Sequence, residues 1–174
     1  MKKLPIFRIP LGERIGRKKY LNEEEVKRLL DGEVIIEEKL DGKAVMNRIG
    51  EYEVYFEFMK WKHSIFYNKL PAWEILLDVV KDGRVLPYDF KLEFARKHGF
   101  HAAPLIYRGR VNNLQELVRF LDRESAFGEE TIEGIVVKNY RNQVFGKLVR
   151  KEFYEGIEEH WLRKPKVMNR IFKY

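Results

Sequence analysis

The sequence predicts an α+β fold with mainly antiparallel sheets and flanking helices. Segments with strand chemistry outnumber those with helical spacing. Two pairs of these segments are joined by short turns, as neighbouring antiparallel strands are. No regular alternation of strand and helix appears, which argues against a parallel sheet. The 174 residues, 45% of them apolar, can fill one core. No repeat or linker divides them, so we expect a single domain over residues 1–174.

The N-terminal part predicts an arm followed by a short helix. Residues 1–20 show no periodic pattern and are expected to form the arm. Asn22-Glu23-Glu24-Glu25 is a capping box, in which the first and last side chains satisfy each other's backbone N–H groups. Apolar residues then recur at helical spacing before Gly32, which ends the helix: Val26, Leu29 and Leu30.

Three strands are expected next. Residues 33–40 and 43–48 form the first two, and Asp41-Gly42 between them is a favoured two-residue hairpin turn. Residues 51–58 alternate between polar and apolar, which indicates a strand with one face in the core and Glu57 on the polar face. A further apolar run covers residues 73–80.

The second half predicts two helices, a hairpin and a helical tail. Residues 89–97 form a helix that ends at Gly99, with a core stripe of Phe90, Phe94 and Ala95. Asn112-Asn113 caps a short helix, and strands at 131–140 and 144–150 form a hairpin. A last helix is expected at 153–162, within a C-terminal helical tail at 153–174.

The charge and the apolar runs bear on partners and compartment. There are 34 Lys and Arg residues against 27 Asp and Glu, a net charge of +7. This excess suits a polyanion such as nucleic acid, although a soluble basic surface explains it equally well. The chain has no cysteine, no apolar run as long as a membrane span and no signal-peptide pattern at its start. We therefore expect a cytoplasmic protein without membrane contact. The oligomeric state stays open.

Lys39, which precedes Asp41-Gly42, is the first candidate for chemistry. A protonated lysine is a poor nucleophile, so a catalytic one needs a nearby cation or desolvation to lower its pKa. At the rim of a hairpin, Lys39 would be held rigidly at the mouth of a pocket. The alternative is a surface lysine before an ordinary turn.

A second cluster, Glu133 to Lys138, places a carboxylate and an amine at the two ends of an apolar strand. If both point into a cleft, Glu133 can hold a divalent metal or a ribose hydroxyl, and Lys138 can neutralise phosphate. Taken alone, the segment more simply predicts a core strand with solvated ends. The third cluster, residues 145–151, is a basic strand that contains Lys147.

In this order the clusters resemble the signature series of covalent nucleotidyltransferases, which comprise ATP-dependent DNA and RNA ligases and mRNA capping enzymes. The likeness is greatest to RNA ligases and spans about Glu33 to Arg170. It implies the architecture of a ligase adenylation domain, which is similar to the ATP-grasp fold. The series consists of Lys39-x-Asp41-Gly42, Glu57, residues 75–79, residues 133–138 and Lys147.

The resemblance implies an enzyme that uses ATP and Mg²⁺ in three steps. The lysine takes AMP from ATP, the AMP passes to a 5′-phosphate of RNA or alternatively DNA, and a 3′-hydroxyl displaces it, an activity suited to RNA repair. Lys39, Glu133 and Lys147 are the implied catalytic residues, and Glu133 is also the implied metal ligand. The implied nucleotide-binding set is Glu38 and Lys39, Glu57 at the ribose, Glu133 at the ribose or metal, Val136 on the adenine, and Lys138 and Lys147 on phosphates.

Two departures from the family pattern matter. The family has two alternating lysines on the last strand, whereas Lys147 is flanked at that spacing by Phe145 and Val149. The second phosphate contact is therefore either missing or made by Arg150 or Lys151. Glu57 also follows Lys39 by a short interval and no second domain follows. Two alternatives therefore stay open, a protein that adenylates itself without joining ends and a non-catalytic nucleic-acid-binding relative.

Basic and aromatic residues interleave at two places, a composition that suits base stacking and phosphate contacts. Core packing explains about half of the rings as well. The four histidines lack the spacing of a structural zinc site. His63 lies in the first of the two places, and the other predicted nucleic-acid contacts are Lys60, Lys62, Lys164 and Lys166.

Overall fold

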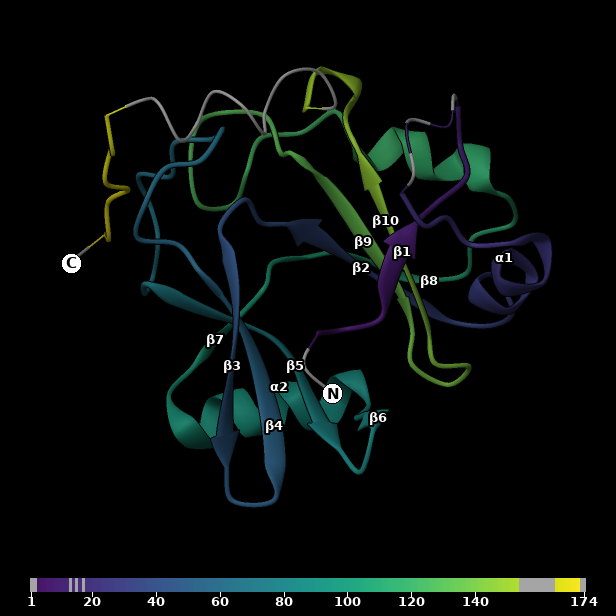
Figure 1. The fold of residues 1–174 in the computed structure, drawn as a ribbon, viewed down its shortest axis with the longest axis horizontal. Coiled ribbons are helices and arrows are strands. Elements are labelled where there is room, and N and C mark those ends of the chain that lie inside the picture. Colours follow the sequence, from purple (N-terminus) through teal and green to yellow (C-terminus); the bar gives the residue numbers. More distant parts are fainter. Residues whose placement is uncertain (1–2, 13, 15, 17, 154–164, 173–174) are drawn as a thin grey trace.

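The computed structural model describes residues 3–12, 14, 16, 18–153 and 165–172. Within these residues the strands form two mostly antiparallel sheets with helices on their outer faces, which confirms the α+β class (Figure 1). The first sheet has the order β1, β10, β9, β2, β8, and the second has the order β3, β4, β5, β6, with β7 pairing with β5. No helix in this part of the chain is long and apolar enough to cross a membrane.

The first sheet is antiparallel except that β1 runs parallel to β10. Its strands are β1 Ile6–Arg8, β2 Val34–Lys39, β8 Leu105–Gly109, β9 Gly134–Asn139 and β10 Val144–Val149. The second sheet is antiparallel except that β7 runs parallel to β5. Its strands are β3 Lys43–Ile49, β4 Tyr52–Phe58, β5 Glu74–Lys81, β6 Arg84–Val85 and β7 His101–Ala102.

The helices begin and end close to where the sequence places them. Helix α1, Glu23–Leu29, carries both bonds of the predicted capping box. Helix α2, Tyr88–His98, ends at Gly99 with φ of +72°, a left-handed conformation that glycine adopts without strain. The segment capped by Asn113 is a 3-10 helix, η1 Leu114–Phe120, and a shorter one, η2 Lys151–Phe153, follows β10.

The predicted hairpin between residues 33–40 and 43–48 is wrong. Strands β2 and β3 lie in different sheets, so Asp41-Gly42 is a crossing between sheets and not a hairpin turn. A Cβ on Gly42 would lie 2.5 Å from the carbonyl oxygen of Phe58, so glycine is needed for the close approach of β4. The Asp41 carboxylate accepts the backbone N–H groups of Ser64, at 2.6 Å, and Ile65, at 3.0 Å. Asp41 thus anchors the loop at Ser64 and Gly42 lets β4 approach, and neither residue reverses a strand.

Other expectations hold in part. The hairpin of β9 and β10 is confirmed. In α2, Phe94 and Ala95 are buried as predicted, but Phe90 is 37% exposed and the buried positions include Lys91. Residues 165–172 are extended, not helical, and bridge to the segment at 61–70. The helix expected at 153–162 falls almost wholly on residues 154–164, which lie outside the described residues.

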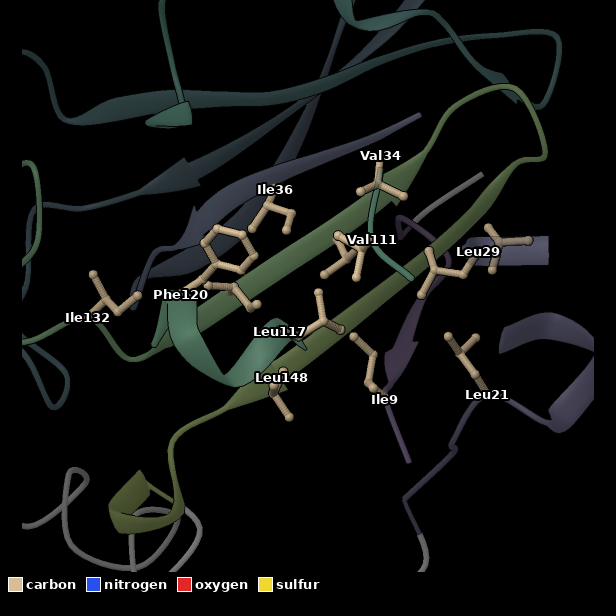
Figure 2. Packing of buried hydrophobic residues seen from close by; sticks show 13 residues of the cluster. Ile9, Leu21, Leu29, Val34, Ile36, Val111, Leu117, Phe120, Ile132 and Leu148 are labelled. Atoms are coloured by element: carbon tan, nitrogen blue, oxygen red, sulfur yellow. The ribbon is translucent and has the colours of Figure 1, made fainter. Parts of the chain in front are cut away.

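Apolar side chains are buried on the outer faces of the two sheets and between them, in four clusters. Helices α1 and η1 cover the outer face of the first sheet, where Leu29, Leu117 and Phe120 pack on the strands (Figure 2). Helix α2 covers the outer face of the second sheet. Between the sheets, Ile35 and Phe145 of the first pack against residues of the second that include Tyr55. A further apolar cluster, which includes Leu40, Met59 and Ile65, packs next to the candidate site.

Candidate active site

The candidate site is organised around an ion pair between Lys39 and Glu133. Lys39 is the last residue of β2, and Glu133 immediately precedes β9, in which Gly134 is the register partner of Lys39. The Lys39 Nζ lies 3.0 Å from each carboxylate oxygen of Glu133. The two side chains are 23% and 13% exposed, so both groups can be reached from solvent. The pair joins residues 94 positions apart in the chain.

Gly134 fixes where Glu133 lies. A Cβ on Gly134 would come within 2.2 Å of the carbonyl oxygen of Leu148 on β10, so only glycine lets the two backbones approach so closely. The Glu-Gly pair of the sequence motif therefore has a physical basis. Glycine brings the start of β9 against β10, and the preceding carboxylate reaches Lys39.

Glu57 approaches the pair from the second sheet. On β4 it shares a face with Tyr55, which packs between the sheets, so this face is buried and is not the polar face that the alternation predicts. Its Oε1 accepts the backbone N–H of Gly42 at 3.0 Å. Burial raises the pKa of Glu57 to about 7, Lys39 and the Gly42 amide act against this, and Glu133 and Asp41 add to it. Carboxylates from both sheets thus act on the one ammonium group of Lys39.

Lys147 lies on the same face of the first sheet as Lys39. Register partners share a face, and Lys147 pairs with Val136, which in turn pairs with Glu37 two positions before Lys39. Burial lowers the pKa of Lys147, and the positive charges of Lys39 and Arg8 lower it further. Burial also raises the pKa of Glu133. This face therefore presents Lys39, the half-buried Val136 and Lys147. Beside them lie two carboxyl groups whose pKa is raised by burial, those of Glu57 and Glu133.

A family model described as RNA ligase matches residues 43–151, which are 109 of the 174 residues. The chain belongs to the RNA ligase family. A search of curated proteins found no match. The family match begins four residues after Lys39, so it includes Glu57, Glu133 and Lys147 but not the candidate nucleophile. The part of Lys39 in this ligase-type site rests on its contact with Glu133.

Glu38 does not fit the role in nucleotide binding that the family resemblance implies. Alternation along β2 turns its side chain to the face opposite that of Lys39. It is 3% exposed, and burial raises its pKa to about 7. In this member of the RNA ligase family, Glu38 is therefore a buried carboxyl group behind the site.

Lys138 is likewise not available to phosphates. Its Nζ lies 2.7 Å from Asp78, 2.5 Å from Glu37 and 3.1 Å from the Leu77 carbonyl oxygen, and the residue is 2% exposed. Burial alone lowers the pKa of Lys138, but Asp78 and Glu37 outweigh burial and raise it above the usual value. The expectation of a phosphate contact is corrected, because the ammonium is already bound by two carboxylates.

A second buried lysine completes this ionic cluster. Lys91 of α2 is fully buried, and its Nζ lies 2.7 Å from Glu37, 2.9 Å from the Leu77 carbonyl oxygen and 3.8 Å from Asp78. The Tyr140 hydroxyl donates to Asp78 at 2.6 Å. The cluster ties both sheets to α2 beneath the site. Sequence reasoning missed Lys91 and Glu37, because charged residues in a helix and a strand predict solvent-exposed positions.

The described residues among the predicted nucleic-acid contacts lie on two neighbouring segments, the one after β4 and the stretch 165–172. Lys60 and Lys166 lie on the ring of Trp61, with their Nζ atoms 5.3 Å and 5.7 Å from its centre. The Lys62 backbone N–H donates to the Val167 carbonyl oxygen at 2.7 Å, which holds the extended stretch 165–172 beside this segment. His63 adjoins it, next to the loop held by Asp41, and Lys164 lies outside the described residues.

The first sheet also carries a hollow that the sequence did not predict. It has a volume of about 310 Å³ and lies at the edge formed by β1. Its lining residues are Ile6, Phe7, Arg8, Lys18, Lys19 and Lys147. The only sequence signal was the basic composition of the arm.

Proposed function

We propose that this chain is an ATP-dependent RNA ligase in which Lys39 becomes covalently adenylated. AMP then passes to a 5′-phosphate end, and a 3′-hydroxyl displaces it to join the two ends. The observation that carries the proposal is the ion pair of Lys39 and Glu133 on a partly open face, beside Glu57 and Lys147. Membership of the RNA ligase family supports the same reaction type.

The first step follows from the contacts of Lys39. Its ammonium group must lose a proton before it can attack, and the Glu133 carboxylate, 3.0 Å away, is placed to accept that proton. The Nζ then forms a bond to the α-phosphorus, and the bond from that phosphorus to the bridging oxygen breaks. Pyrophosphate leaves with its electron pair, and Lys147 balances the charge that develops on the phosphates.

The remaining site residues would position the nucleoside. Val136 is the half-buried apolar residue of this face and would contact the adenine. Glu57 would accept a hydroxyl of the ribose, since its carboxylate is held in place by the Gly42 N–H. Lys39 then meets the α-phosphate with the base and sugar fixed on either side, which favours the in-line geometry of the displacement.

The residues also fit a magnesium ion. No group of three or more His, Asp or Glu side chains able to hold a metal occurs among the described residues. Mg²⁺ needs only one or two carboxylates when phosphates and water complete its shell. Glu133, with Glu57 beside it, would hold the ion, and a cation there would offset the burial that raises the pKa of both carboxyl groups. The ion would neutralise phosphate charge.

The test is labelling with ATP and Mg²⁺ followed by denaturing electrophoresis. Label from the α-phosphate, but not from the γ-phosphate, should stay on the protein. Lys39→Ala and Lys39→Arg should both abolish labelling, because arginine cannot be deprotonated to become the nucleophile. Lys97→Ala, at an exposed position on α2, is the matched control and should label normally. Normal labelling of either Lys39 variant would reject the proposal.

A further inference from the structure

The N-terminal strand brings a second cation beside Lys147. β1 runs parallel to β10, and Arg8 is the register partner of Lys147. Register partners share a face, and adjacent strands lie about 4.8 Å apart, so Arg8 continues the row of positive side chains across the sheet. The pKa of Lys147 is lowered by Arg8 and by Lys18 among other groups, which agrees with their closeness.

The arm after β1 doubles back along the same edge. The Arg8 backbone N–H donates to the Lys19 carbonyl oxygen at 3.0 Å, and the Leu21 N–H donates to the Arg8 carbonyl oxygen at 2.9 Å. These bonds hold Lys18 and Lys19 at the hollow described above. Of its lining residues, Arg8, Lys18, Lys19 and Lys147 are cationic, and no carboxylate lines it within the described part of the arm. Such a hollow suits an anion with several oxygens.

The residues that the sequence offered for the second phosphate contact are placed elsewhere. The Arg150 guanidinium donates to Glu152 at 2.8 Å and to the Leu121 carbonyl oxygen at 2.9 Å. Lys151 is exposed in η2, beyond the end of β10. The site face of β10 therefore carries one lysine, and its neighbouring cation comes from β1.

The order of the strands indicates which phosphates these cations meet. Lys39 lies on β2, Lys147 on β10 two strands away, and Arg8 on β1 one strand further. In phosphoryl transfer the leaving group departs roughly in line with the attacking atom and on its far side. A triphosphate whose α-phosphorus lies at Lys39 therefore extends its outer phosphates toward Lys147 and Arg8.

We propose that Arg8 and Lys18 bind the β- and γ-phosphates of ATP and the pyrophosphate that leaves, so that the N-terminal arm supplies the second cation beside Lys147. This inference rests on the proposed adenylation of Lys39. It assigns the arm to the first step of the reaction. Transfer of AMP to RNA, which involves no pyrophosphate, does not need these residues.

The test uses Arg8→Ala and Lys18→Ala, with Lys97→Ala as the control. The exposed Lys18 can be replaced without disturbing the core, so it decides the result if Arg8→Ala fails to fold. For each variant, the rate of labelling is measured against ATP concentration. The isolated lysyl-AMP form is then given either inorganic pyrophosphate, which reverses the first step, or RNA with a 5′-phosphate, which takes up AMP.

We expect Arg8→Ala to lower kcat/KM for adenylation and the rate of reversal by pyrophosphate roughly a hundredfold, with a smaller loss for Lys18→Ala. AMP transfer to RNA should be unchanged. Normal reversal together with impaired transfer would overturn the inference in favour of an RNA phosphate at the hollow. Unchanged rates in every assay would overturn it as well.

Binding of pyrophosphate separates this inference from the proposed function. Calorimetry with inorganic pyrophosphate and Lys39→Ala measures the hollow in a protein that cannot be labelled. Weaker binding on adding Arg8→Ala supports the inference even where wild-type protein takes no label and the proposed function fails. Equal binding with and without Arg8→Ala rejects it, whatever the labelling result.

Discussion

Replacing Glu38 with glutamine tests whether this carboxyl group is structural. Glu38 is 3% exposed, and its pKa rises from 4.5 to about 7 on burial. Such a rise corresponds to about 3 kcal/mol of unfolding free energy. Because the folded pKa is raised, the native state binds more protons than the unfolded state between pH 4.5 and about 7. The contribution of Glu38 to the free energy of unfolding therefore becomes less favourable as the pH increases through this window.

Glu38→Gln removes that loss while keeping the shape of the side chain. We expect the variant to match wild type at pH 4.5 and to be more stable at pH 8 by up to about 3 kcal/mol. Urea unfolding followed by circular dichroism at both pH values measures this difference. Adenylation should be retained, because the side chain faces away from Lys39.

The control for Glu38→Gln is Glu129→Gln, at an exposed position, which should change stability by less than about 0.5 kcal/mol at either pH. Glu57 titrates in the same window, so only the difference between wild type and Glu38→Gln isolates Glu38. A variant with the same pH dependence as wild type would refute the energetic argument. Loss of adenylation in a folded Glu38→Gln protein would restore its role in nucleotide binding.

Three further outcomes are expected. Glu133→Ala and Lys147→Ala should each slow adenylation roughly a hundredfold, as measured by labelling, and a Lys147→Ala protein that labels normally would show that the phosphate lysine is misplaced. Lys91→Met leaves two buried carboxylates with one cation fewer and should cost about 3–5 kcal/mol in urea unfolding, so a change within error would contradict the ionic cluster. In the absence of ATP, pre-adenylated RNA ends should be joined faster than a pre-adenylated nick in duplex DNA, and faster joining of the DNA nick would reject RNA as the preferred substrate. The affinity for RNA should fall less steeply with added salt in Lys60→Ala and Lys166→Ala than in wild type.

Features that depend on neighbouring residues could be predicted from the sequence. The capping box of α1 and the hairpin of β9 and β10 are such cases, because a turn or a cap is decided within a few residues. The motif Asp41-Gly42 was misread for the same reason. Its glycine is required by the close approach of the Phe58 carbonyl oxygen, and its aspartate accepts a hydrogen bond from the backbone of Ser64. Neither contact can be inferred from the neighbouring residues in the sequence.

The site needed information from across the chain. The partners Lys39 and Glu133 are 94 positions apart. From composition and periodicity alone, Lys39 could equally be a surface lysine before a turn, and Glu133 the solvated end of a core strand. Their order along the chain, as a resemblance to a ligase family, made them one hypothesis. Arg8 carried no such signal, since its place beside Lys147 arises from the parallel pairing of β1 with β10, which lies far away in the sequence.

The most direct test of the central claim is peptide mapping of the protein after incubation with ATP and Mg²⁺. The digest and separation are kept alkaline, because a phosphoramide bond is labile in acid. The account predicts that AMP is attached to the peptide containing Lys39, and that acid treatment removes it. AMP on a different lysine, or an unmodified Lys39 peptide in a folded protein supplied with ATP and Mg²⁺, would contradict the account.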